Sequence, residues 1–243
     1  MENSMGKGKF KGRRASAFIF DLDGTLVDSG LDIALSANFT RLHFNLAELP
    51  TSTVLSYVGD GVARLLSRTL GHNILTGQTG SAGLPVSEDL HREAMAVFAD
   101  HYGRHLLDNT RLYPGVLDIL GRFRNFPMHV ATNKPQAFTE AILDGVHLAG
   151  AFRRVIGGDA VASRKPDPAH LEACLDGLNV PLDEVVMVGD SPNDIQAAQA
   201  LGVISVGCTY GLVLPGTVKA AKPDFLIGGI GELADLFPSR TNL

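Results

Sequence analysis

The strongest constraint on the fold is a repeated pattern in which a short apolar segment of strand character precedes a helical one. The strand pattern occurs at residues 17–20, 128–131, 154–156, 184–188, 203–206 and 224–227. Helical periodicity follows four of these segments, at residues 136–147, 169–178, 193–201 and 230–236. Short apolar strands that alternate with helices favour parallel pairing, with helices on both faces of the sheet. The sequence therefore predicts an α/β fold built on a doubly wound parallel sheet.

More than a hundred residues separate the first predicted strand from the second, where a single helix would be usual. No strand pattern occurs between residues 29 and 113, and the periodicity there is helical at 31–42, 62–70 and 88–106. Residues 71–87 are rich in Gly, Thr and Ser and are predicted to form a loop. We therefore expect a helical cap at 29–113, inserted into a core of residues 15–28 and 114–243. Ligands bind beyond the carboxyl ends of strands in open α/β sheets, so this cap is positioned to act as a lid.

The composition suits a globular protein with one sizeable core and a smaller second unit. The chain has 243 residues, of which 45% are hydrophobic and 19% charged, with a net charge of −5 and no Trp. A nucleic-acid surface needs clustered basic residues and stacking aromatics, so we expect no nucleic-acid partner. Five basic residues from Lys7 to Arg14 lie among Gly and Ser, which predicts a flexible tail at residues 1–14. No apolar run reaches the roughly 18 residues of a membrane span, so we expect a cytoplasmic protein without a membrane partner.

Chemically active side chains follow the ends of four predicted strands. They are Asp21 and Asp23 after the first, Thr132, Asn133 and Lys134 after the second, Arg164 and Lys165 in a loop beyond the third, and Asp190 after the fourth. The carboxyl ends of parallel strands open on one side of a sheet, so we expect these groups to share one rim.

Asp21 and Asp23, in the string DLDGT, stand on the same side of an extended chain, where their charges repel. A calcium loop would need a third oxygen ligand before its glycine, whereas Gly24 follows Asp23 at once. We therefore interpret the pair as covalent phosphoryl chemistry, in which Asp21 attacks phosphorus and water later cleaves the aspartyl phosphate. Asp23 is predicted to donate a proton to the leaving oxygen and then to accept one from that water.

The string TNKP combines features of a helix start and of a phosphate site. Thr132 or Asn133 would suit a helix cap, and Pro135 the first turn. The free N–H groups of a helix N-terminus, together with the Thr132 hydroxyl, also suit a phosphoryl group. Phosphate contact is therefore favoured over capping alone.

Lys165 lies in the string SRKPDP, just ahead of a predicted helix. Pro166 biases Lys165 toward an extended backbone, and Asp167 with Pro168 fits an N-cap followed by a first helical residue. A lysine held in this way can balance the charge of nearby carboxylates and a phosphate. We therefore predict a functional role for Lys165 rather than a surface one.

Asp190 ends a fully apolar strand, where a carboxylate is costly unless a cation or a donor meets it. A magnesium ion shared by Asp21, Asp23 and Asp190 would relieve carboxylate repulsion and let an anionic nucleophile approach a phosphate. Asp194 is open to two interpretations. Its spacing from Ser191 is that of a capping box, but it could equally bind the metal or support its ligands.

DLDGT, TNK, Lys165-Pro166 and GDSPND, in this order, resemble the four motifs of the haloacid-dehalogenase-like hydrolase superfamily, and the similarity extends over nearly the whole chain. The resemblance implies that Asp21 is the nucleophile and Asp23 the acid/base. The resemblance also implies a Mg2+ cofactor bound by Asp21, Asp23 and Asp190. It further implies that Thr132, Asn133 and Lys165 contact the phosphate.

We therefore expect an enzyme, a magnesium-dependent phosphatase whose partner is a small phosphorylated metabolite. A dehalogenase has no need for a second acid, so Asp23 argues against one. A phosphomutase, a pyrophosphatase or a sugar phosphatase would share the core motifs. A non-catalytic phosphate-binding module should have lost one of the charged groups, and none is missing.

Substrate discrimination is expected from the lid, above all from the segment YVGDGVARLLSR. Gly59 and Gly61 permit a tight turn before a helix that begins at Val62. Arg64 and Arg68 share a face of that helix, and each could instead be a solvated surface residue. By its match to the family pattern, Arg68 is predicted to bind a carboxylate on the substrate.

The remaining metal-ligating residue types form no functional spacing. Cys174 and Cys208 match neither a disulfide framework nor a metal site and are predicted to be buried reduced thiols. His43, His129 and His170 are predicted to be packed or surface residues rather than catalytic ones.

Overall fold

One parallel sheet lies at the centre of the structure, a computed structural model that describes residues 14–72 and 87–237. Its strands are β1 (Ala17–Phe20), β4 (Met128–Ala131), β5 (Arg154–Ile156), β6 (Val185–Gly189), β7 (Ile204–Cys208) and β8 (Phe225–Ile227). They lie in the order β5-β4-β1-β6-β7-β8, and all neighbours are parallel. The predicted doubly wound sheet is confirmed, and every strand bound lies within two residues of its prediction.

Alternate residues of β1 pack into two separate cores, as the period of two in a strand requires. Phe18 and Phe20 belong to one core, and Ala17 and Ile19 to the other. All four side chains are fully buried, which explains why the segment is apolar at every position. The ring of Phe18 stacks on that of Phe123, with 4.4 Å between the ring centroids.

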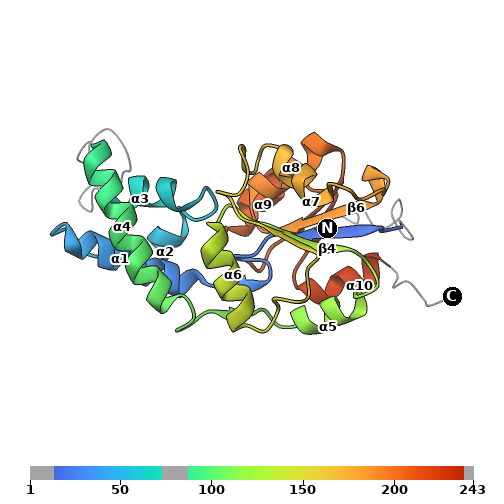
Figure 1. Ribbon diagram of the computed structural model, residues 1–243, viewed down its shortest axis with the longest axis horizontal. Helices are drawn as coiled ribbons and strands as arrows, with labels where there is room; N and C mark the ends of the chain where they lie inside the picture. Colours follow the sequence, from blue (N-terminus) through green and yellow to red (C-terminus); the bar gives the residue numbers. More distant parts are fainter. Residues whose placement is uncertain (1–13, 73–86, 238–243) are drawn as a thin grey trace, which may run out of the picture.

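Helices cover both faces of this sheet (Figure 1). One face carries α7 (Ala169–Leu175), α8 (Pro192–Leu201) and α9 (Pro215–Ala220). The other carries α5 (Val116–Arg122), α6 (Gln136–Gly145) and α10 (Leu233–Leu236), and short 3-10 turns lie at Leu182–Glu184 and Ile230–Glu232. The sequence pattern does not predict α5 or α9, because each has only two turns or fewer of periodicity to detect.

Four further helices lie together beyond one end of the sheet, at the left of Figure 1. They are α1 (Gly30–His43), α2 (Thr51–Leu55), α3 (Val62–Leu70) and α4 (Glu88–His105). The periodicity predicts three of them, while the five residues of α2 are too few to show it. We call these four helices, together with the turn at residues 56–61 that joins α2 to α3, the helical unit.

Two short strands connect the helical unit to the rest of the chain. β2 (Val27–Asp28) and β3 (Arg111–Leu112) form an antiparallel pair. The buried carboxylate of Asp32 strengthens this junction by accepting bonds from the backbone N–H groups of Asn109 and Thr110. The prediction that no strand occurs between residues 29 and 113 is therefore wrong, because pairing across the junction, not local sequence, creates β3.

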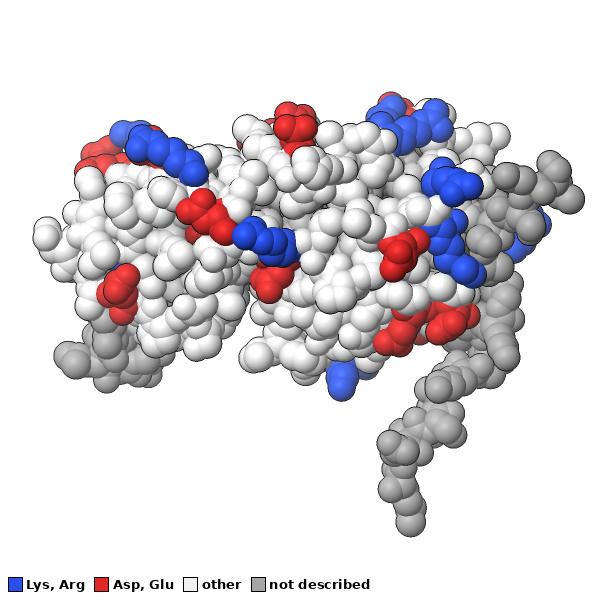
Figure 2. Space-filling model, turned by 90° about the horizontal axis from the view of Figure 1, so that it is seen from below, with Lys and Arg blue, Asp and Glu red and all other residues white. Residues whose placement is uncertain are grey.

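The described residues test some of the remaining sequence predictions and do not reach others. Cys174 and Cys208 are buried and unpaired, as predicted. The predicted tail, except Arg14, and most of the loop at 71–87 lie outside the described residues. The predicted boundaries of the cap remain predictions. No helix within residues 14–72 or 87–237 has the length and apolar character that crossing a membrane requires. Charges of both signs are interspersed on the molecular face shown in Figure 2.

His129 gives the fold a predictable sensitivity to acid. Its ring is fully buried on β4, and neither ring nitrogen has a hydrogen-bond partner within residues 14–72 and 87–237. Burial, with Arg153 and Arg154 nearby, lowers the pKa of His129 to about 4. Between pH 6.5 and 4 the unfolded chain therefore binds a proton that folded His129 excludes, so stability falls as the pH is lowered through this window.

We expect His129→Leu to reduce this loss, measured as the difference in the free energy of unfolding between pH 7 and pH 4.5. The variant should lose about 1–3 kcal/mol less than the parent over this interval. Urea unfolding at both pH values measures the difference. Equal losses in variant and parent would show that His129 does not set the acid sensitivity.

Candidate active site

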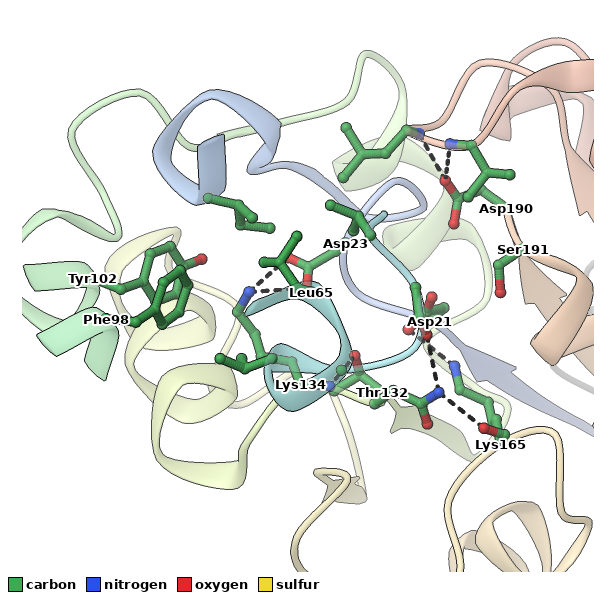
Figure 3. Close-up of a pocket in the computed structure, with 18 residues that line it drawn as sticks. Asp21, Asp23, Leu65, Phe98, Tyr102, Thr132, Lys134, Lys165, Asp190 and Ser191 are labelled. Carbon is green, nitrogen blue, oxygen red and sulfur yellow. Dashed lines mark hydrogen bonds and ion pairs between the residues drawn. The ribbon is translucent and has the colours of Figure 1, made fainter. Parts of the chain in front are cut away.

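A pocket lies at the carboxyl ends of the strands, between the sheet and the helical unit. Its lining includes the predicted residues Asp21, Asp23, Thr132, Asn133, Lys165 and Asp190. The helical unit contributes an apolar wall made of Ile33, Val58, Val62, Leu65 and Phe98. Figure 3 shows Asp21 and Lys165 at one end, Tyr102 and Phe98 at the other, and Asp23 with Lys134 between them. Six of the seven predicted site residues therefore meet in one place.

Asp21 is positioned by the end of β1. Its N–H donates to the carbonyl of Val188 on β6, 2.9 Å away, and its Oδ1 accepts a bond from the N–H of Leu22 at 2.8 Å. The chain then turns at Gly24, whose φ is +80°. A Cβ at this position would lie 2.0 Å from Oδ2 of Asp190, so only glycine fits between the two acidic segments.

The Lys165 ammonium forms ion pairs with two carboxylates at the pocket. Its buried Nζ lies 3.0 Å from Oδ1 of Asp21 and 2.6 Å from Oδ1 of Asp194, and it also donates to the carbonyl of Ala131. Burial alone would lower the pKa of Lys165, but Asp194 and Asp21 raise it. The lysine is therefore a permanent positive charge in the site, and the prediction that it is not a surface residue is confirmed.

The backbone of Lys165 is held by a buried histidine. Nδ1 of His170 accepts the N–H of Lys165 at 3.2 Å, and Nε2 lies 3.1 Å from the carbonyl of Ile156. Burial and the charge of Lys165 lower the pKa of His170 to about 4, so the ring is neutral. His170 is thus a packed residue, as predicted. α7 begins at Ala169, as the periodicity predicts, but its N-cap is Pro168 and not the predicted Asp167.

Asp194 has both a capping role and an electrostatic one. Its Oδ2 accepts bonds from the backbone N–H and the hydroxyl of Ser191, at 2.9 and 2.7 Å, which ties down the start of α8. Its Oδ1 pairs with Lys165. The structure therefore confirms the capping interpretation and adds a contact to the site that sequence spacing does not reveal.

Asp190 lies buried beside these groups. Its Oδ2 accepts bonds from the N–H groups of Leu212 and Val213, at 2.7 and 3.2 Å. Burial and the charges of Asp21 and Asp194 nevertheless raise the pKa of Asp190 well above its ordinary value. Burial also raises the pKa of Asp21, to about 7, against the opposing effect of Lys165. Lys165 therefore does not fully offset the negative charge of these clustered carboxylates.

These carboxylates fit a divalent cation. Oxygen atoms of Asp21, Asp190 and Asp194 lie within 4.8 Å of one another, and Mg2+ prefers oxygen ligands. A bound cation would also favour the ionised carboxylates. Asp23 is not part of this cluster, so its assignment as a metal ligand stays a prediction.

Asp23 is held instead by its own lysine. Nζ of Lys134 lies 2.9 and 3.1 Å from the two Asp23 oxygens, and the Ser29 hydroxyl donates to Oδ1 at 2.5 Å. The Lys134 ammonium also lies 4.7 Å from the centre of the Tyr102 ring. The sequence places Lys134 on the same rim but assigns it no role, and nothing in the sequence pattern singles out Ser29 or Tyr102.

Thr132 and Asn133 do not cap α6, which begins at Gln136 after Pro135. The N–H of Gln136 is bound by Oδ1 of Asp159 at 2.7 Å. The hydroxyl of Thr132 accepts a long 3.3 Å bond from the N–H of Lys134. The alternative of capping is therefore wrong, while phosphate contact by Thr132 and Asn133 stays a prediction.

The turn between α2 and α3 touches the core directly. The carbonyl of Gly59 accepts bonds from the side-chain amides of Asn133 and Asn193, at 3.0 and 3.2 Å. Asn193 also donates to Oδ1 of Asp60 at 2.8 Å. Gly59 and Gly61 both have positive φ, which confirms the predicted turn. These bonds hold the helical unit against the strand ends.

Arg68 points to this turn and does not line the pocket. Its guanidinium lies 2.5 Å from Oδ2 of Asp60, and that of Arg64 lies 3.8 Å away from the same atom. Burial alone would raise the pKa of Asp60, but Asn193 and Arg68 together lower it. Contact between Arg68 and a substrate stays a prediction, and it requires the pair with Asp60 to open.

Comparisons with known proteins agree with this geometry. The family model described as haloacid dehalogenase-like hydrolase matches residues 18–208. The chain is 36% identical to a phosphoglycolate phosphatase from Colwellia psychrerythraea, with 88% of this chain and 93% of that protein covered. It is 40% identical to one from Rhodospirillum rubrum, with 80% of each covered. A crystal structure of a predicted phosphoglycolate phosphatase from Haemophilus somnus has a TM-score of 0.81 and 29% identity, and covers 93% of this chain and 98% of its own.

The fold and the site together define a class of α/β proteins in which carboxylates and a buried lysine meet at the ends of parallel strands, beneath inserted helices. The chain belongs to the haloacid dehalogenase-like hydrolase family. It is therefore an enzyme, as the four sequence motifs predict.

Proposed function

We propose that this enzyme is a phosphatase that hydrolyses a small phosphate monoester through a phosphorylated Asp21. The observation that carries the proposal is a buried carboxylate, Asp21, paired with Lys165, with a second carboxylate, Asp23, held two residues away by a different lysine. Two carboxylates with separate partners can take separate roles in one reaction. The relatives named phosphoglycolate phosphatase support the same reaction class.

Asp21 is the nucleophile in this proposal. Its Oδ1 is engaged by the N–H of Leu22 and by Lys165, which leaves Oδ2 to attack phosphorus. The bond between phosphorus and the ester oxygen breaks, and Asp23 donates a proton to the departing oxygen. Water then attacks the aspartyl phosphate and gives its proton to Asp23, so inorganic phosphate leaves and both carboxylates return to their starting state.

The positive charge for this reaction has two sources in our proposal. Asp21 and Asp190 would hold Mg2+, with Asp194 beside them and Asp23 as a further predicted ligand. When bound, the ion offsets the repulsion between the anionic nucleophile and the phosphate. Lys165 is the second source, because its ammonium pairs with Asp21 and Asp194. We also propose that Thr132, Asn133 and Lys165 contact the phosphate.

We propose 2-phosphoglycolate as the substrate, cleaved to glycolate and phosphate. The cavity measures about 50 Å3, room for only a few water-sized groups, which favours a small leaving group. The helical unit acts as a lid in this account, because its apolar wall covers the pocket and its turn at Gly59 is bonded to the core. Closure of such a wall excludes water from the reaction.

A substrate panel tests the proposed function. We expect kcat/KM to be higher for 2-phosphoglycolate than for ethyl phosphate, a sugar phosphate or pyrophosphate, and activity to vanish in excess chelator and return with Mg2+. Release of inorganic phosphate measures each rate. Preference for a sugar phosphate or pyrophosphate would overturn the substrate, phosphate transfer to a second sugar position would indicate a mutase, and full activity in chelator would remove the metal.

A further inference from the structure

Tyr102 carries a buried hydroxyl that has no hydrogen-bond partner among the described residues. The side chain lies on α4, is only 1% exposed and lines the pocket. Burial raises the pKa of Tyr102 to about 12, so the hydroxyl keeps its proton and remains a donor at neutral pH. Buried hydroxyls are normally bonded, so a donor left unpaired in a ligand pocket points to an acceptor on the ligand.

Lys134 provides a second donor beside this hydroxyl. Its ammonium lies against both oxygens of Asp23 and over the Tyr102 ring, and it has three N–H groups in all. Burial alone would lower the pKa of Lys134, but Asp23 and Tyr102 raise it, so the charge is retained. The contacts with the two Asp23 oxygens leave an ammonium with three N–H groups the capacity to bind a further acceptor on the ligand.

Among the described residues, the rest of the apolar wall that the helical unit forms over the pocket has no further hydrogen-bond donor in its side chains. Tyr102 is the only residue of the helical unit that lines the pocket with a polar side chain, within the part of the chain that the structure describes. Arg68 is outside the lining and is paired with Asp60. An anionic group that enters this end of the pocket therefore meets one ammonium and one hydroxyl beside Asp23, with apolar side chains around them.

The position of these donors matches the leaving group. Figure 3 places Asp21 at one end of the pocket, Asp23 in the middle and Tyr102 at the other end. If Asp23 protonates the ester oxygen, the leaving group extends from Asp23 toward Tyr102. The carboxylate carbon of 2-phosphoglycolate is two bonds from that oxygen, so its carboxylate falls beside Lys134.

We propose that Lys134 and Tyr102 together bind the carboxylate of the leaving group and so determine substrate specificity. This inference rests on the proposed function and assigns the contact to residues other than Arg68. It extends to any small monoester that bears a carboxylate close to the ester oxygen.

Tyr102→Phe is the sharpest test, because it removes one unpaired hydroxyl and keeps the ring that packs on Phe98 and Lys134. The measured quantity is the ratio of kcat/KM for 2-phosphoglycolate to kcat/KM for ethyl phosphate, which has a neutral leaving group. We expect Tyr102→Phe to lower this ratio about tenfold, the effect of one lost hydrogen bond to a charged group.

Tyr57→Phe is the matched control. It also removes a hydroxyl from a tyrosine of the helical unit, but that hydroxyl pairs with His72 at 2.7 Å, and Tyr57 does not line the pocket. The ratio should not change in this variant. Lys134 itself is unsuitable, because its loss would also release Asp23 and slow both substrates.

The outcomes separate this inference from the proposed function. A parent enzyme with no preference for 2-phosphoglycolate over ethyl phosphate would overturn both. With that preference present, an unchanged ratio in Tyr102→Phe would overturn the inference and leave the proposed function intact. A fall in the ratio for Arg68→Ala but not for Tyr102→Phe would return the contact to Arg68.

Discussion

Asp21→Asn is expected to lower turnover of every phosphate ester by more than about a thousandfold, because an amide oxygen cannot replace the attacking carboxylate. The side chains are nearly isosteric, so the fold should persist. The bond from the N–H of Leu22 to Oδ1 can remain, since the amide keeps an oxygen acceptor. Steady-state phosphate release and the thermal midpoint of unfolding measure the two effects separately.

Asp28→Asn is a suitable control for this change. Asp28 is exposed on β2, seven residues after Asp21, and lies outside the pocket lining. We expect activity close to that of the parent. Turnover by Asp21→Asn within about tenfold of the parent would contradict the assignment of Asp21 as nucleophile.

Gly24→Ala is the second large effect that we expect, and it acts through shape rather than charge. The new Cβ would lie 2.0 Å from Oδ2 of Asp190, and the φ of +80° is unfavourable for alanine. Displacement of Asp190 should lower activity by more than about a hundredfold. The free energy of unfolding should fall by about 1–3 kcal/mol.

Gly121→Ala is the matched control, because it replaces a glycine at a position where the new Cβ meets no other atom. Gly121 lies in α5, where a Cβ would have no neighbour within 4 Å. We expect full activity and equal or slightly greater stability, as for glycine replaced inside a helix. If Gly24→Ala retained parent activity and stability, the close approach of Gly24 to Asp190 would not be a requirement of the site.

The sequence predicts most of the core because its strands carry a strong local signal. β1, β4 and β5 are short and mostly apolar, and their predicted bounds agree with the structure residue for residue. The shared rim follows from parallel pairing, which is why six site residues could be placed together without coordinates.

The remaining features depend on contacts between distant segments, which a local pattern does not contain. β3 exists only because it pairs with β2, some eighty residues earlier. Lys134, which follows β4, meets Tyr102 of α4 across a long sequence separation. Arg68 points away from the pocket because it is paired with Asp60. Helical spacing places Arg64 and Arg68 on one face but does not say whether that face meets the pocket or the turn.

Direct detection of a phosphoryl group on Asp21 tests the central claim, covalent transfer to this residue. Asp23→Asn should slow hydrolysis of the intermediate, while formation from 4-nitrophenyl phosphate needs no proton on the leaving oxygen. The variant can therefore be mixed with this ester and Mg2+, quenched in acid, digested and examined by peptide mass spectrometry. The account predicts one phosphoryl group on the peptide that contains Asp21, and none when Asp21→Asn is added to the same chain. A phosphoryl group on a different residue, or stoichiometric phosphate release by Asp21→Asn alone, would contradict it.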